Sequence, residues 1–119
     1  MLIGIDLGTT NSAVAVWRDE QSQLVPNALG ELLTPSAVSI DASGQVWSGA
    51  AALDRMATHP EETVTSFKRM MGTEATVKLG KRTFRAEELS AVILNSLVED
   101  VEQALGERPT EAVITVPAY

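Results

Sequence analysis

The stretch Gly4–Ser12, with the sequence GIDLGTTNS, decides the fold that we expect for this chain. Apolar runs flank it on both sides: Leu2-Ile3 comes before it and Ala13–Trp17 follows it. Two strand-forming runs joined by so short a Gly/Thr/Asn segment are typical of a β-hairpin. We therefore predict two antiparallel strands, with the polar residues at the turn that connects them.

The predicted turn has the chemistry of a phosphate loop. Gly8 lets the backbone approach a ligand closely, and consecutive amide N–H groups in a tight turn form an anion-binding concavity. Thr9, Thr10 and Asn11 add two hydroxyls and an amide. The Asp6 carboxylate just before the turn suits Mg²⁺, which takes few protein ligands and keeps most of its waters. An ordinary hairpin turn uses the same residue types, so the loop alone leaves both interpretations open.

Composition narrows the class of protein. The chain has 119 residues, of which 45% are hydrophobic, as expected for one globular domain with one core. Its net charge of −7 argues against a protein that binds nucleic acid through a basic surface. It contains no cysteine, which excludes disulfides and thiolate metal sites. Because we find neither a signal-peptide pattern nor an apolar run of membrane-spanning length, we expect a cytoplasmic protein without membrane contact.

Short strands and helices are predicted between residues 20 and 85. Strand-like runs bounded by turn residues occur over 23–26, 37–40, 45–48, 76–79 and 82–84. The last two form a hairpin through Gly80-Lys81, with glycine in the first position as a type II′ turn requires. Alanine-rich residues 49–56 predict a short helix.

Residues 58–72 allow two helical interpretations. Thr58 and Glu61 have the spacing of a capping box, which would start a helix at Thr58. Thr63 is an alternative cap for a helix over residues 64–71, ending at Gly72.

The most regular pattern lies in the last third of the chain. Apolar residues recur at spacings of three and four, namely Leu89, Val92, Ile93, Leu97, Val101 and Leu105. They predict one helix over residues 86–105, which Gly106 and Pro109 terminate. The β-branched run 112–116 then predicts a fully buried central strand. A strand–helix–strand order favours an α/β fold whose sheet is at least partly parallel.

Three segments in this order resemble the N-terminal part of the ATPase domain of the seventy-kilodalton heat-shock (DnaK-class) chaperones. They are GIDLGTTNS at 4–12, FKRMMG at 67–72 and AVITVPAY at 112–119. The segment 27–36 also resembles the linking segment of that family. The first motif is shared with the wider actin and sugar-kinase superfamily, whereas the other two make the resemblance specific to the chaperones.

The resemblance implies a fold and an organisation. It implies an actin-like (ribonuclease H-like) ATPase lobe, with a mixed sheet, a long crossover helix and a small α+β insertion. Residues 1–35 and 86–119 would be part of subdomain IA, and residues 36–85 would be subdomain IB. The second lobe and the peptide-binding domain are not among these 119 residues, so we expect a fragment that is incomplete for catalysis.

The resemblance also implies ligands and roles for individual residues. ATP or ADP would bind with Mg²⁺, which Asp6 would hold through waters. Thr9, Thr10 and Asn11 would cradle the β- and γ-phosphates, and Gly8 would allow their close approach.

Two more residues have implied roles. Lys68 matches the catalytic lysine, which orients the attacking water and meets the developing charge. Without the Phe-Lys-Arg context it would be an ordinary solvated surface charge. Pro117 matches the proline switch that relays the nucleotide state, although any proline at this position would also end the strand.

Partners follow from the same resemblance. They are unfolded peptide clients and a J-domain co-chaperone, while the use of a nucleotide-exchange factor stays open. The short segment Thr73–Arg85, together with His59-Pro60 and the acidic run 99–102, resembles the specialised HscC branch. The fragment is also expected to self-associate, because an unpaired strand edge is a template for another copy.

Two other classes share the first motif. A sugar- or glycerol-kinase-type phosphotransferase would share the phosphate loop, but Phe67–Arg69 and Val116–Tyr119 count against it. An actin-like filament protein would share the Gly-x-Asp-x-Gly-Thr pattern without the Thr10-Asn11 continuation.

Overall fold

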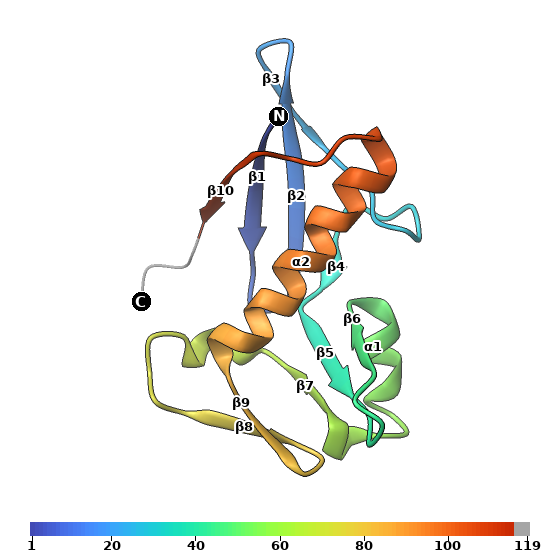
Figure 1. The fold of residues 1–119 in the computed structure, drawn as a ribbon, viewed down its shortest axis with the longest axis vertical. Helices are drawn as coiled ribbons and strands as arrows, with labels where there is room; N and C mark the ends of the chain where they lie inside the picture. The colour runs from blue at the N-terminus through green and yellow to red at the C-terminus, as the bar shows by residue number, and fades with distance from the viewer. Residues whose placement is uncertain (116–119) are drawn as a thin grey trace.

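A twisted sheet and the long helix that crosses one of its faces form the larger part of the molecule (Figure 1). This computed structural model describes residues 1–115. The sheet has the strand order β10-β1-β2-β3, and its strands are β1 (Leu2–Leu7), β2 (Asn11–Arg18), β3 (Gln21–Leu24) and β10 (Glu111–Thr115). β1 and β2 are antiparallel, with Ile5 opposite Val14, which confirms the predicted hairpin. β10 runs parallel to β1, so the sheet is mixed as expected.

The third strand begins two residues earlier than the predicted range 23–26. Asp19 and Glu20 both adopt left-handed backbone conformations, with φ angles of 51° and 64°. Two such residues make a tight turn whose twist matches that of the flanking strands, so pairing resumes at once with Gln21 opposite Arg18. The strand ends at Leu24, before Pro26, which has no amide N–H to donate.

Helix α2 (Ala86–Leu105) matches the predicted helix at both ends. At its start the Glu88 carboxylate accepts a 2.9 Å hydrogen bond from the Arg85 amide. At its end Gly106 has a φ of 71°, and its amide donates to the Glu102 carbonyl at 2.8 Å. The buried stripe of this helix packs into the same core as β1 and β2, and comprises Leu89, Ile93, Leu97 and Val101. Burying each such side chain contributes about 1.5–3 kcal/mol.

A second, smaller sheet lies beside the first and has the order β6-β5-β7. Its strands are β5 (Ala37–Ile40), β6 (Val46–Ser48) and β7 (Thr63–Thr65), and helix α1 (Ala50–Arg55) packs against it. The short strand β4 (Thr34–Pro35) still pairs with β2. The chain therefore passes from one sheet to the other at Ser36. The predicted hairpin over 37–48 and the predicted helix over 49–56 are confirmed.

The predicted helix over residues 64–71 is wrong. Thr63–Thr65 form β7, whose three residues pair with β5, and only Phe67–Met70 are helical, as the 3₁₀ turn η2. The alternative start at Thr58 is also wrong, since another 3₁₀ turn, η1, covers Pro60–Glu62. The physical reason is tertiary: β-branched residues 63–65 complete an edge of the second sheet, and the Thr63 hydroxyl bonds to Ser39 rather than capping a helix.

The prediction of a buried central strand over residues 112–116 is also wrong. Every residue of β10 is exposed, including Val113 at 59% and Ile114 at 43%. Among the described residues β10 pairs only with β1, so it is an edge strand. Composition indicated a strand correctly, but position in the sheet depends on which neighbours are present.

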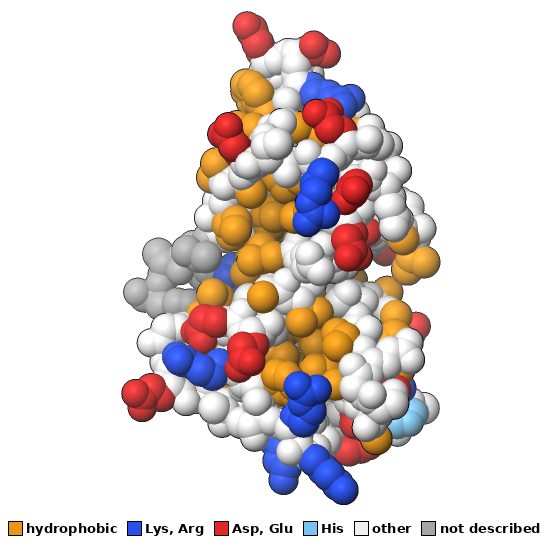
Figure 2. All heavy atoms as spheres, in the orientation of Figure 1, with side chains coloured by type: hydrophobic (Ala, Val, Ile, Leu, Met, Phe, Trp, Pro, Cys, Tyr) orange, Lys and Arg blue, Asp and Glu red, His pale blue; other side chains and the backbone are white. Residues whose placement is uncertain are grey.

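A separate two-stranded sheet carries four basic residues, namely Lys78, Lys81, Arg82 and Arg85. β8 (Thr76–Leu79) and β9 (Arg82–Arg85) form a hairpin, and Gly80 has the positive φ, 61°, that its turn requires. Figure 2 shows Lys and Arg side chains gathered at the lower end of the molecule, where this hairpin lies. Lys78, Lys81 and Arg82 are exposed, as expected for a solvated face. Within residues 1–115, no helix has the length and apolar character needed to cross a membrane.

Candidate functional site

The turn between β1 and β2 is so tight that residue 8 has to be glycine. A Cβ atom on Gly8 would lie 2.1 Å from the Asn11 carbonyl oxygen, far inside contact distance. Residues 8–11 therefore reverse the chain direction in a tight turn. Thr9 is half-buried there, and Thr10 and Asn11 are exposed. The sequence predicted a glycine that lets a ligand approach the backbone; the structure shows that the turn itself already requires glycine at this position.

Two amide donors of the loop have no partner among the described residues. Neither the Thr9 nor the Thr10 amide N–H donates a hydrogen bond to any residue of the described chain. Backbone donors that lack a protein partner need water or a ligand. Adjacent N–H groups in a turn form the concavity that binds phosphate oxygens, so this geometry fits an anion.

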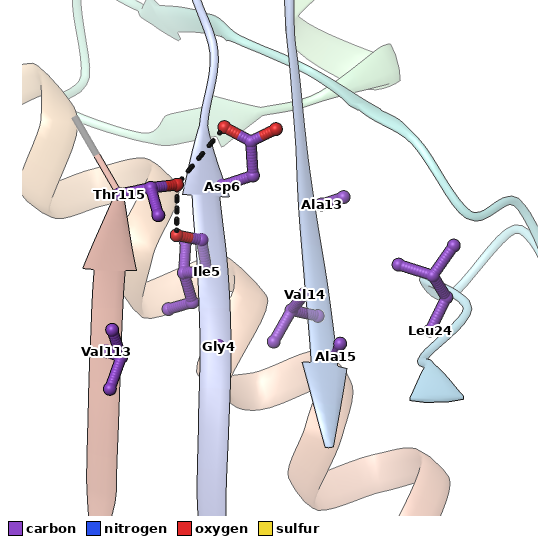
Figure 3. A pocket seen from close by; sticks show the side chains of 9 residues that line it. All are labelled: Gly4, Ile5, Asp6, Ala13, Val14, Ala15, Leu24, Val113 and Thr115. Atoms are coloured by element: carbon purple, nitrogen blue, oxygen red, sulfur yellow. Dashed lines mark hydrogen bonds between the residues drawn. The ribbon is translucent and has the colours of Figure 1, made fainter. Parts of the chain in front are cut away.

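Asp6 lies at the end of β1 beside this loop. Its side chain is on the sheet face away from α2, and Figure 3 shows it next to Thr115 of β10. The Thr115 hydroxyl is 3.2 Å from the Ile5 carbonyl oxygen and 3.4 Å from Asp6 Oδ1. A hydroxyl has one proton, so Thr115 shares it between these acceptors and leaves most of the Asp6 acceptor capacity free. No local sequence signal marks Thr115, because only the parallel pairing of β10 with β1 places it opposite Asp6.

The hollow that Figure 3 displays on this sheet face is not itself the phosphate site. Its walls are apolar side chains from β1, β2 and β10 together with Leu24, and its volume is about 210 Å³. Residues 8–11 do not line it, and its polar groups lie at one end, at Asp6 and Thr115.

The Asp6 charge also acts on Lys68, which comes from a distant part of the sequence. The preceding residue, Phe67, is 2% exposed and anchors η2 in the core. Lys68 is itself only 3% exposed, and within residues 1–115 it forms no ion pair or side-chain hydrogen bond. Burial lowers the pKa of Lys68 below its ordinary value, while the negative charge of Asp6 acts in the opposite direction. A buried lysine influenced by Asp6 is not the solvated surface charge that the residue type alone would indicate.

Local backbone strain accompanies this placement of Lys68. Ser66, just before η2, has φ 55° and ψ 28°, the left-handed conformation that non-glycine residues seldom adopt. Such strain persists only where the surrounding structure imposes it. Here β7 fixes the chain on one side and the buried Phe67 side chain fixes it on the other. No sequence signal marked Ser66.

The residues present fit a magnesium–nucleotide complex. Within residues 1–115 no group of three or more His, Cys, Asp or Glu side chains gathers to hold a metal ion. From this part of the chain a cation would have Asp6 alone, which suits Mg²⁺ held largely by water and phosphate oxygens. Of the predicted site residues, Gly8, Thr9, Thr10 and Asn11 form the turn, Asp6 lies just before it, and the Asp6 charge acts on Lys68. Pro117, the predicted switch, lies outside the described residues.

Comparison with known families agrees with this geometry. Residues 2–119 match the sequence model of the family described as Hsp70 protein. This family has an actin-like ATPase fold, and the mixed sheet crossed by α2 is consistent with part of it. Its members are ATP-binding chaperones that use nucleotide with Mg²⁺ and bind client peptides and co-chaperones. Because the match covers essentially all 119 residues, the chain belongs to the Hsp70 family and represents its nucleotide-binding region.

Proposed function

We propose that this chain supplies one wall of the ATPase site of a molecular chaperone, namely the first phosphate loop and the catalytic lysine. One observation carries the proposal: unpartnered amide donors at Thr9 and Thr10 lie in a turn beside Asp6, whose charge acts on the buried Lys68. The donors and the carboxylate come from the β1–β2 hairpin, and Lys68 comes from η2, on which the Asp6 charge acts.

The chemistry of each residue follows from its surroundings. Bound Mg²⁺–ATP would supply the transferable phosphoryl group and neutralise part of its charge. The Thr9 and Thr10 amides would donate to phosphate oxygens, and Asp6 would accept hydrogen bonds from the metal's water shell. Lys68, shielded from bulk water, would stabilise charge as it develops, because electrostatic interactions are stronger where water is excluded.

The 119 residues alone are not expected to hydrolyse ATP at a useful rate. Phosphoryl transfer depends on groups held together around the phosphates, and this chain provides only one side of that arrangement. Nucleotide affinity should also be low, since a ligand on an open wall keeps most of its surface in water. Micromolar binding of Mg²⁺–ATP by the isolated chain would contradict this part of the proposal.

The role of Lys68 can be tested in the full-length polypeptide that carries this sequence. Lys68→Ala should abolish single-turnover ATP hydrolysis and leave Mg²⁺–ADP affinity almost unchanged, because its contact strengthens only in the transition state. Lys81→Ala, which removes an exposed lysine from the β8–β9 turn, is the matched control. Normal turnover in Lys68→Ala would refute a catalytic role.

The finer assignment to the HscC branch is part of the same proposal. It is supported by the compact segment 73–85, which consists of little more than the β8–β9 hairpin before α2 begins. With it we propose a cytoplasmic chaperone that works with unfolded peptide clients and a J-domain partner. Whether an exchange factor participates can be decided by measuring ADP release from the full-length protein with and without a DnaK-type exchange factor.

A further inference from the structure

The segment that leaves the main sheet after β4 holds the phosphate loop through one buried serine. Ser36 is 3% exposed and makes two hydrogen bonds to the loop and one to Ser12. Its amide donates to the Thr10 carbonyl at 2.9 Å, and its hydroxyl donates to the Gly8 carbonyl at 2.8 Å. Its hydroxyl oxygen also lies 2.8 Å from that of Ser12, which is 1% exposed.

The direction of the serine–serine hydrogen bond follows from counting protons. The Ser36 hydroxyl has a single proton, and the Gly8 carbonyl can only accept, so that proton is directed to Gly8. The Ser12 hydroxyl must then donate to Ser36. Ser12 thus fixes the rotation of the Ser36 hydroxyl, although the Ser12 side chain makes no hydrogen bond to residues 8–11 in the described structure.

The two anchored carbonyls determine where the amides of the loop point. All described peptide bonds are trans, and a trans peptide places its C=O and the next residue's N–H on opposite sides. With the Gly8 and Thr10 carbonyls turned toward Ser36, the Thr9 and Asn11 N–H groups turn away from it. Ser36 is buried, whereas Thr10 and Asn11 are exposed, so solvent and ligands reach the loop at these two residues.

We propose that Ser36 is a positioning residue of the phosphate loop. It binds the Gly8 and Thr10 carbonyls and thereby directs the unpartnered Thr9 amide toward a bound nucleotide phosphate, with Ser12 acting through it. This inference rests on the proposed function, since it names what orients the same site. Ser36 touches no ligand in this scheme and acts only through the loop backbone.

The test compares two buried serines in the full-length polypeptide. Ser36→Ala removes a hydroxyl that makes two hydrogen bonds, one to the Gly8 carbonyl and one to the Ser12 hydroxyl. Ser39→Ala is the matched control, because the Ser39 hydroxyl is 0% exposed and also has two side-chain partners, Arg55 and Thr63, away from the loop. Calorimetry measures Mg²⁺–ADP affinity, single-turnover kinetics measure hydrolysis, and thermal unfolding measures stability.

We expect Ser36→Ala to weaken Mg²⁺–ADP affinity by about tenfold and Ser12→Ala by about threefold, as for lost hydrogen bonds. Ser39→Ala should lower the unfolding temperature to a similar extent while leaving affinity unchanged. The double variant Ser12→Ala/Ser36→Ala should be no weaker than Ser36→Ala, because Ser12 acts only through Ser36.

Three outcomes would overturn the inference. The first is an affinity of Ser36→Ala within twofold of the unmodified protein, and the second is an equal loss in Ser39→Ala. The third applies if Ser36→Ala does not fold: unchanged affinity in Ser12→Ala then refutes the inference. If the unmodified protein itself fails to bind Mg²⁺–ADP, the proposed function fails first and the positioning role with it, so the two failures are distinguishable.

Discussion

Replacing Gly8 with alanine tests the tightness of the phosphate loop most directly. The added Cβ would lie 2.1 Å from the Asn11 carbonyl oxygen, whereas Cβ contacts below 3.0 Å are essentially never seen. Backbone must therefore move by about 0.9 Å, from 2.1 to 3.0 Å, because no flexible side chain is available to yield. Overpacking of this kind destabilises by roughly 1–3 kcal/mol.

Gly4→Ala is the matched control. Gly4 lies on β1, the strand that leads into the loop, and a Cβ there would meet no atom within 4 Å. Where an alanine fits without strain it stabilises by about 0.4–1 kcal/mol, because it restricts the unfolded chain. Gly8→Ala should thus lower the free energy of unfolding, whereas Gly4→Ala should raise it.

Urea unfolding of the 119-residue chain, followed by circular dichroism, measures the stability of both variants. In the full-length polypeptide a displacement near 1 Å should also reduce ATP turnover by about 100-fold in Gly8→Ala. If Gly8→Ala is as stable as Gly4→Ala and retains nucleotide binding, the loop is not as tight as described and our reasoning about Gly8 is wrong.

Three further predictions concern other parts of the chain. Lys68→Met should raise stability near neutral pH, since burial lowers the Lys68 pKa and makes folding with the charge unfavourable. The loss of stability caused by the buried charge is complete at pH values below the Lys68 pKa in the folded protein. It disappears as pH rises from that pKa toward 10.5, the ordinary lysine value, so the urea midpoints of wild type and variant should converge over this range. Arg55→Ala should lower the free energy of unfolding by about 2–4 kcal/mol in thermal unfolding, because it removes contacts with Glu62, Ser39 and the Trp47 ring. Arg108→Ala, which breaks an exposed ion pair, should lower it by under about 0.5 kcal/mol. Equal effects of the two changes would show that the contacts of Arg55 contribute no more than an exposed ion pair. The 119-residue chain should associate at micromolar concentration through the exposed β10 edge, and Val113→Lys should restore a monomer in light scattering; association that persists in Val113→Lys would place the contact elsewhere.

Local patterns were sufficient where a segment's conformation depends on its own residues. The range of α2 was predicted to the residue, because its apolar stripe, its acidic first turn and Gly106 all act within the helix. The β1–β2 hairpin and the β8–β9 turn were predicted for the same reason. Patterns failed at residues 63–71, where pairing with β5 outweighed the helical interpretation, and at β10, whose burial depends on neighbours that no local pattern contains.

In the candidate site, too, some features follow from local sequence and others only from tertiary structure. By itself the sequence determined the chemical types and the loop: a glycine that permits a tight turn, polar residues after it, a carboxylate before it, and a motif that marks Lys68. Only the tertiary structure decided that Lys68 is buried within the influence of Asp6, that Ser36 hydrogen-bonds to Gly8, and that Thr115 hydrogen-bonds to Asp6. The reason is physical. A turn is governed by interactions within a few residues, whereas burial, desolvation and hydrogen bonds between distant segments exist only after the sheets and α2 have packed together.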